Sequence, residues 1–279
     1  MSVTTVNATT PAVRKTQQPD KANKRRVKPR DLAIGLVLPL TILLLWQVAA
    51  QRAWISPIFL PLPSTTLFSF FDMVERQSFH IDFLASISIV TQAFVYGTLL
   101  GVGLGIAAGL SQTVERIFGP TLDGIRHIPG IAWLPLIVLW VGIGPAAKIV
   151  VITKTVFFPV FLNTLQGIRA VEKNFIELAD VLTLTRWQLV RKVIIPGAMP
   201  SILVGVRYGA SLAWALVVVA EGLSGMEGIG YLIFRAQSLL MTDQLLVCMV
   251  VIGVVGFLID RSMALLQRHV LRWKQGFEG

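Results

Sequence analysis

The sequence contains few of the residues that disulfide-bonded, metal-binding and catalytic proteins need. It has a single cysteine, Cys248, so a disulfide within the chain is excluded, and its three histidines (His80, His127 and His269) are scattered. The patterns HExxH, CxxC and GxxxxGK[ST] are absent, which excludes the common zinc-protease, thiol-redox and nucleotide-phosphate motifs. We therefore expect no catalytic residue, no metal site and no cofactor in this chain.

Charged residues are also scarce, and acidic ones more so than basic ones. Only 14% of the residues are charged, whereas 54% are hydrophobic, and the mean hydropathy is +0.71. Such a chain is more apolar than a soluble domain needs to be. The net charge of +10 is not arranged as a basic stripe with interleaved aromatics, so nucleic acid is not an expected partner. The composition predicts an all-α integral membrane protein in a lipid bilayer.

Apolar runs predict six membrane-spanning helices, because runs of about 20 residues cross roughly 30 Å of hydrocarbon. The predicted spans are residues 32–51, 83–114, 127–147, 149–168, 200–220 and 244–259. Pro129 and Pro135 fall in the third, which should therefore be broken or kinked. A broken helix in a membrane needs protein or a water-filled path to cover its free carbonyls, so this segment is expected to line a path.

The distribution of Lys and Arg predicts the orientation of these spans. Eight of the 25 basic residues precede residue 31, which indicates a cytosolic N-terminus by the positive-inside rule. With six spans, both termini are cytosolic, and residues 51–82 and 221–243 lie outside. Three regions follow: a basic tail at 1–30, expected to be disordered, a first helix with an external loop at 31–82, and a core domain at 83–273.

One polar interruption, within residues 172–198, has the pattern of folded structure. Its apolar residues keep helical spacing on one side, as in an amphipathic surface helix. Thr185 and Gln188 form a capping-box pattern, so a first short helix should end near Thr183 and a second begin at Thr185. We expect the second to stop at Pro196 and Gly197, and Pro200 to lie in the first turn of the next span.

At these residues the chain resembles the permease subunits of bacterial ATP-binding cassette (ABC) importers, of the binding-protein-dependent type I family. Their cytosolic coupling loop reads Glu-Ala-Ala, then Leu-Gly, then a hydrophobic residue followed by Pro-x-x-x-Pro. Here the matching positions are Glu177, Ala179, Leu182, Pro196 and Pro200. Leu178 replaces one alanine, and Thr183 replaces the glycine of the tight turn, where a left-handed conformation suits glycine best.

The resemblance extends from about residue 31 to 273 and implies several partners. These are two cytosolic ABC ATPase subunits, an external solute-binding protein and a second permease copy in a homodimer, all at the bacterial cytoplasmic membrane. The phrases LPLIVLW, FPVFLNT and GIGYL are most similar to the branch that moves aliphatic sulfonates, with relatives for taurine, nitrate and bicarbonate. The resemblance also implies an ATPase-coupling set: Glu177, Leu178, Ala179, Asp180, Leu182, Thr183 and Thr185.

Polar residues inside the spans are candidates for the translocation pathway. The set is Trp133, Lys154, Asn163, Arg207 and Ser211. Lys154 and Arg207 lie well inside their predicted helices, where a cation is costly and is a functional candidate by default. Both would suit an anionic substrate. The alternative is that their long side chains reach water at the membrane surface.

A glycine ladder predicts close packing of the second span. Gly97, Gly101, Gly105 and Gly109 recur every four residues and therefore share one helix face, which suits the approach of another helix. The alternative is a dinucleotide-binding pattern, G-x-G-x-x-A, that begins at Gly103. No predicted strand precedes it and the run is uncharged, so the context that such a site requires is missing.

Two functions of other classes remain to be compared. An ATPase-independent channel or ion-coupled transporter would need acidic residues within the spans, and such residues occur only near span ends, at Glu221, Asp243 and Asp260. An intramembrane serine protease would need Ser224 beside a histidine, but His127 is predicted at the opposite face.

Overall fold

The computed structural model describes residues 29–224 and 227–273, and side chains within 37–223 and 227–273. The predicted tail at 1–30 lies almost entirely outside these residues. Within the described ranges the chain is helical and contains no strand, so the all-α prediction is confirmed. The α-helices are α1 (Pro29–Gln51), α2 (Pro63–Arg76), α3 (Phe79–Leu110), α4 (Gln112–Arg126), α5 (Leu134–Val141), α6 (Pro145–Arg169), α7 (Lys173–Val181), α8 (Arg186–Leu189), α9 (Ile195–Ser224), α10 (Ile229–Ser238) and α11 (Thr242–Val270).

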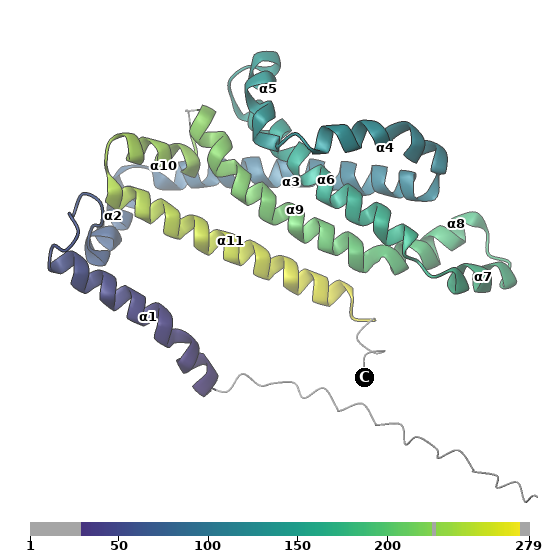
Figure 1. Ribbon diagram of the computed structural model, residues 1–279, viewed down its shortest axis with the longest axis horizontal. Coiled ribbons are helices and arrows are strands. Elements are labelled where there is room, and N and C mark those ends of the chain that lie inside the picture. Colours follow the sequence, from purple (N-terminus) through teal and green to yellow (C-terminus); the bar gives the residue numbers. More distant parts are fainter. Residues whose placement is uncertain (1–28, 225–226, 274–279) are drawn as a thin grey trace, which may run out of the picture.

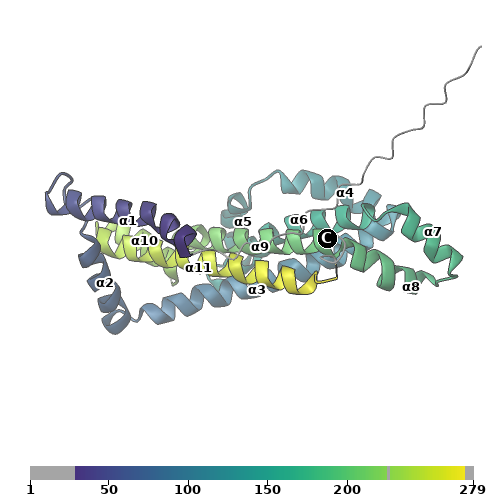
Figure 2. The same ribbon diagram turned by 90° about the horizontal axis from the view of Figure 1, so that it is seen from below.

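The long helices α3, α6, α9 and α11 lie side by side along the length of the molecule (Figure 1). Helix α6 is central, because α3 and α9 both pack against it, and α11 packs on α9. Helices α2 and α10 lie at one end, and α7 and α8 lie at the other, as both side views show (Figures 1 and 2). We call these the α10 end and the α7–α8 end.

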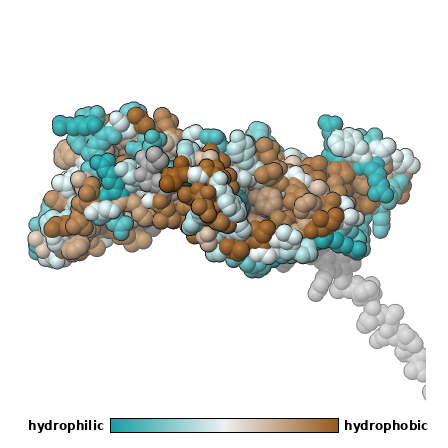
Figure 3. Space-filling view, turned by 90° about the horizontal axis from the view of Figure 1, so that it is seen from above, coloured by the Kyte–Doolittle hydropathy of each residue, from teal (hydrophilic) through white to brown (hydrophobic). Residues whose placement is uncertain are grey.

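The number of apolar helices agrees with a multi-pass membrane protein. Four continuous helical stretches are long and apolar enough to span: Phe79–Leu110, Pro145–Arg169, Arg186–Leu223 and Thr242–Val270. A fifth span can form from α4 and residues 130–141, which meet at a bend of 93°. The part of α1 whose side chains are described, Val37–Gln51, is apolar but shorter than the four spanning stretches. Hydrophobic residues cover much of the middle of the molecule, and hydrophilic residues gather towards its ends (Figure 3).

The predicted third span is broken, but its boundaries differ from the prediction. Helix α3 ends at Leu110 rather than 114, because the Ser111 side chain accepts a hydrogen bond from the Val114 N–H (3.4 Å) and starts α4. A 3₁₀ turn, Gly130–Trp133, follows Pro129, and α5 ends at Val141, followed by Gly142 with a φ of +91°. Residues 127–147 therefore hold the 3₁₀ turn, α5 and the first residues of α6, and no continuous span.

The glycine ladder of α3 faces a matching ladder on α6. Gly97, Gly101, Gly105 and Gly109 lie against Val156, Val160, Thr164 and Ile168, which also recur every four residues. A Cβ added at any of these glycines would stand 2.6 to 2.9 Å from a side-chain carbon of α6, closer than real Cβ contacts allow. The two helices can therefore approach this closely only because one face of α3 lacks side chains.

The polar loop between α6 and α9 begins with the two predicted short helices. Helix α7 ends with paired bonds from Thr183 N to Asp180 O and from Leu184 N to Ala179 O (both 3.0 Å), which form a Schellman motif. Thr183 occupies its left-handed position with φ +51°. Thr185 then forms the predicted capping box with Gln188 and starts α8.

The expected stop at Pro196 and Gly197 is wrong. Helix α8 continues through a π-helix, Val190–Ile194, into α9, so Pro200 lies inside α9 rather than in its first turn. The wider π turn relieves the clash that the Pro196 ring would make with the preceding turn of an α-helix. As a result, the loop and the following span share one helical rod.

Candidate functional site

The α7–α8 loop presents unpartnered apolar side chains at the end of the molecule. Leu178 and Leu182 are 55% and 61% exposed, and Val181, which the sequence did not single out, is 79% exposed. The other residues of the expected coupling set are also exposed, namely Glu177, Asp180, Thr183 and Thr185. A rim of acidic and hydroxyl groups around exposed leucines is typical of a protein-binding surface.

Ala179 belongs to the same motif but does not face outward. Its side chain is only 2% exposed and packs within this chain, while its carbonyl completes the turn after α7. Ala179 therefore supports α7 from within the chain and offers little surface to a partner. The helical period explains this, because α7 turns one side to its own chain and the opposite side to solvent.

Lys154 joins α6 to the broken segment between α4 and α5. Its Nζ donates to the Ile128 carbonyl (2.8 Å) and lies 5.1 Å from the Trp133 ring centroid and 5.5 Å from that of Phe158. No described residue forms an ion pair with it. The indole Nε1 of Trp133 is buried and has no hydrogen-bond partner among the described residues. The site thus offers a positive charge with no counter-ion among the described residues.

Arg207 has a different environment from Lys154. Its guanidinium donates two hydrogen bonds to the Asp260 carboxylate, from Nε to Oδ1 (2.7 Å) and from Nη2 to Oδ2 (2.8 Å). This pair connects α9 to α11 and balances the charge of Arg207. The sequence placed Asp260 at a span end, but it did not indicate that the carboxylate faces α9.

The remaining pathway candidates make bonds within their own helices. Asn163 donates from Nδ2 to the Pro159 carbonyl (2.8 Å), and its Cβ lies against the position of Gly205 on α9. Ser211 donates to the Arg207 carbonyl (3.3 Å) and is exposed. Among the described residues, no hydrogen bond or ion pair brings the five candidates together into one site.

A buried polar cluster at the α10 end was missed by the sequence analysis. Glu221 and Ser86 are fully buried (0% exposed), and Lys148 is 2% exposed. Ser86 Oγ donates to Glu221 Oε2 (2.8 Å), and backbone N–H groups at the start of α10 donate to both side chains. The available signal was a carboxylate directly after the apolar run that ends at Ala220.

Comparison with known proteins decides the family. The model of the family described as "Binding-protein-dependent transport system inner membrane component" matches residues 97–272. The chain belongs to this family. Its members are permease components of ABC importers, so the resemblance drawn from the loop is confirmed.

Permeases of this family with named substrates are similar over most of the chain. The "Putative aliphatic sulfonates transport permease protein SsuC" of Bacillus subtilis (strain 168) is 36% identical over 245 residues, covering 88% of this chain and 89% of the relative. The "Taurine transport system permease protein TauC" of Escherichia coli (strain K12) is 34% identical, covering 91% and 96%.

Solved structures of importer permeases share the fold. A chain of the MetNI methionine ABC transporter aligns with a TM-score of 0.60 at 19% identity, covering 67% of this chain and 93% of that one. A chain of an amino acid ABC transporter aligns with a TM-score of 0.59 at 19% identity, covering 72% and 98%. The all-α fold of this protein is therefore that of ABC importer permeases.

Proposed function

We propose that this permease moves a small anionic solute, an aliphatic sulfonate, into a bacterial cell. An external binding protein delivers the solute, and two cytosolic ATPase subunits supply the energy, so the chain itself catalyses no reaction. The sulfonate and taurine permeases that are 36% and 34% identical to it support this substrate class.

The proposed assembly is a homodimer in the cytoplasmic membrane with both termini in the cytosol. In this arrangement the α7–α8 end faces the cytosol, and the exposed Leu178 and Leu182 dock into an ATPase subunit. Because α8 continues into α9, movement of the docked loop is transmitted directly to a membrane span.

The observation that carries the substrate class is the environment of Lys154. In a low-dielectric path, a cation without a carboxylate partner attracts an anion strongly. The Trp133 ring, whose centroid lies 5.1 Å from Lys154 Nζ, keeps the ammonium beside the broken segment. Arg207 contributes less net charge, because Asp260 neutralises it. We propose that Arg207, Asn163 and Ser211 form other parts of the wall.

Uptake by variants of Lys154 tests this role. Lys154→Gln removes the charge and should lower uptake of radiolabelled ethanesulfonate by about tenfold or more, since a charge-assisted hydrogen bond contributes about 1.5–3 kcal/mol. Lys154→Arg should retain much of the uptake, and Arg268→Gln, at an exposed position on α11 outside the coupling loop, is the control for charge loss. Normal uptake by assembled Lys154→Gln protein would contradict an anion site at this residue.

The relatives also favour taurine as a second candidate, and competition separates the two. Taurine carries an ammonium group in addition to the sulfonate, so a sulfonate importer should be inhibited more by ethanesulfonate than by taurine. Nitrate and bicarbonate serve as further competitors. Uptake that continues after the ATPase subunits are deleted would instead indicate a channel or an ion-coupled transporter.

A further inference from the structure

The cluster at the α10 end includes two deeply buried ionisable groups, Glu221 and Lys148, that the proposed transport path does not use. Glu221 is 0% exposed and Lys148 is 2% exposed. Both lie on helices that are long and apolar enough to span a membrane. Burying a charged group is costly unless hydrogen bonds and an opposite charge compensate. The arrangement of those compensating partners indicates what the cluster does.

The first backbone N–H groups of α10 are bound by side chains from other helices. Gly228 N donates to Asp82 Oδ1 (2.8 Å), Ile229 N to Ser86 Oγ (2.9 Å) and Gly230 N to Glu221 Oε2 (2.9 Å). A helix start has N–H groups with no partner inside the helix, and residues just before it usually cap them. Here α3 supplies Asp82 and Ser86, and α9 supplies Glu221.

Two further bonds connect these side chains and the central helix. Ser86 donates its hydroxyl to Glu221 Oε2 (2.8 Å), so α3 and α9 are also bonded to each other. Lys148 of α6 donates to the Glu227 carbonyl (3.2 Å), and its charge acts favourably on Glu221. The start of α10 is therefore connected to all three helices of the central bundle.

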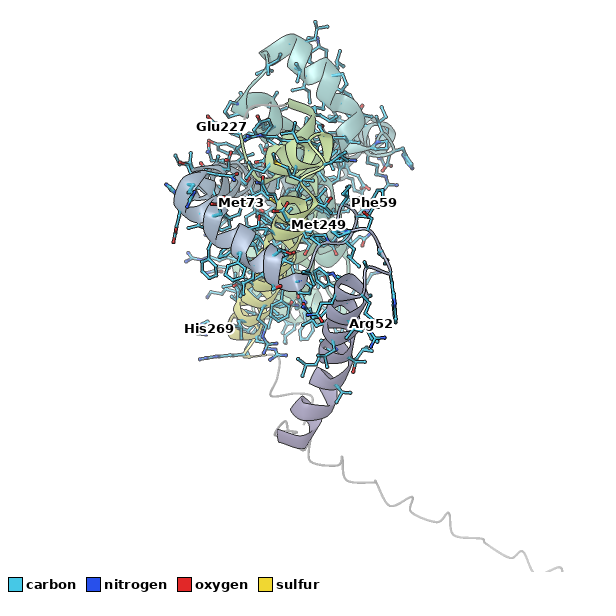
Figure 4. The ribbon with its side chains drawn as sticks, turned by 90° about the vertical axis from the view of Figure 1, so that its left-hand side faces the viewer. Arg52, Phe59, Met73, Glu227, Met249 and His269 are labelled. Atoms are coloured by element: carbon cyan, nitrogen blue, oxygen red, sulfur yellow. The ribbon has the colours of Figure 1, made fainter. Side chains whose placement is uncertain are left out.

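Two positions at the start of α10, Gly228 and Gly230, leave no room for a side chain. Gly228 has φ +112°, and a Cβ there would overlap the Glu221 carboxylate. At Gly230 a Cβ would overlap the Val218 carbonyl of α9. Viewed from the α10 end, Glu227 lies higher in the picture than Arg52 and Phe59 and to their left, away from the loop that follows α1 (Figure 4).

We propose that Glu221 is a positioning residue for transport, which with Ser86, Asp82 and Lys148 fastens the start of α10 to α3, α6 and α9. Movement that enters at the α7–α8 end travels along the α8–α9 rod. Because Glu221 lies near the other end of α9, its bonds carry that movement to α10 as a rigid unit. The effect on transport rests on the proposed function, whereas the fastening itself does not.

Hydrogen exchange of the complex in lipid nanodiscs tests the fastening without a transport assay. Glu221→Ala removes the carboxylate that accepts from Ser86 and Gly230, so the amides of residues 228–230 should exchange more than tenfold faster. Glu221→Gln should stay near the native rate, because its amide oxygen can accept from both Ser86 and Gly230. Ser238→Ala, at the other end of α10, is the control, since its hydroxyl donates to the Phe234 carbonyl of the same helix. Unchanged exchange in Glu221→Ala would overturn the proposal.

Uptake per ATP hydrolysed then distinguishes positioning from simple stability. We expect Glu221→Ala to assemble and hydrolyse ATP but to move at least fivefold less solute per ATP, with recovery in Glu221→Gln. Should Glu221→Ala fail to fold, Ser86→Ala removes the bridging hydroxyl and is the milder substitute. Faster exchange in Ser86→Ala with unchanged uptake per ATP would overturn the transport role. If the native complex moves no sulfonate, the substrate assignment fails, and the exchange result still decides the fastening.

Discussion

Arg207 and Asp260 form a bidentate ion pair between α9 and α11, with N···O distances of 2.7 and 2.8 Å. Planar, two-point contact of this kind has strict geometry, which a lysine could not reproduce. The pair explains how α9 carries an arginine within an apolar stretch. It also links the helix that follows the coupling loop to the last span.

The two residues should act as a unit in stability measurements. Asp260→Asn leaves the guanidinium without its counter-charge, and Arg207→Gln leaves the carboxylate without its counter-charge. Each substitution should therefore lower the thermal midpoint of the purified protein. Once one partner is gone, removing the other should cost little, so the double variant should resemble the single ones. Thermal midpoints of the four proteins test this, and additive decreases would show that the pair does not stabilise the fold.

The α3–α6 contact should not tolerate one additional methyl group. In Gly101→Ala the new Cβ would stand 2.8 Å from the Cβ of Val160, so we expect a loss of about 1–3 kcal/mol in unfolding free energy. Gly103→Ala is the matched control, because nothing lies within 4 Å of its Cβ and alanine favours helix. Denaturation in detergent measures both, and equal effects would contradict the close contact.

Thr183 offers a stabilising substitution in the coupling loop. Its φ of +51° is costly for a residue with a Cβ, so Thr183→Gly should raise stability by about 0.5–1 kcal/mol after the entropy loss of glycine. Thr185→Ala removes the N-cap of α8 and should instead cost about 1 kcal/mol. Differential scanning calorimetry of both variants shows whether each substitution raises or lowers stability. A destabilised Thr183→Gly protein would mean that the threonine side chain makes a compensating contact.

The coupling surface can be separated from the local fold by three substitutions. Leu178→Asp, at an exposed position, should reduce copurification of the ATPase while the permease keeps its thermal midpoint. Glu177→Ala should retain binding but weaken substrate-stimulated ATP hydrolysis. Ala179→Asp should disturb α7 itself, because the site is 2% exposed. Native copurification and stimulation in the first two variants would exclude this loop as the transmission element.

The proposed orientation predicts opposite accessibility of the two ends. Single cysteines at Ser78, at the α10 end, and at Thr185, in the α7–α8 loop, would be introduced in a Cys248→Ala background; both positions are exposed. An impermeant maleimide added to intact cells should label position 78 only, and position 185 should label after the cells are opened. Labelling of both from outside would require a different topology.

Patterns formed by residues close together in the sequence were sufficient to predict much of the fold of this protein. Hydropathy located the four long apolar helices, the Thr185–Gln188 spacing predicted the start of α8, and the ordered matches from Glu177 to Pro200 indicated the family. Each depends on residues a few positions apart, whose relative placement follows from the helical repeat. The glycine ladder likewise indicated a close-packed face, although the sequence did not say that α6 fills it.

Contacts between distant segments depended on the tertiary structure. Arg207 and Asp260 are 53 residues apart, and Ser86 and Glu221 are 135 apart. Whether such groups meet depends on which helices are neighbours and how each is rotated, and one residue turns a helix face by about 100°. The same rotation turned Ala179 inward and Leu178 outward. The continuous α8–α9 rod was also hidden, because a π turn beside Pro196 has no signal as strong as the proline's own preference to end a helix.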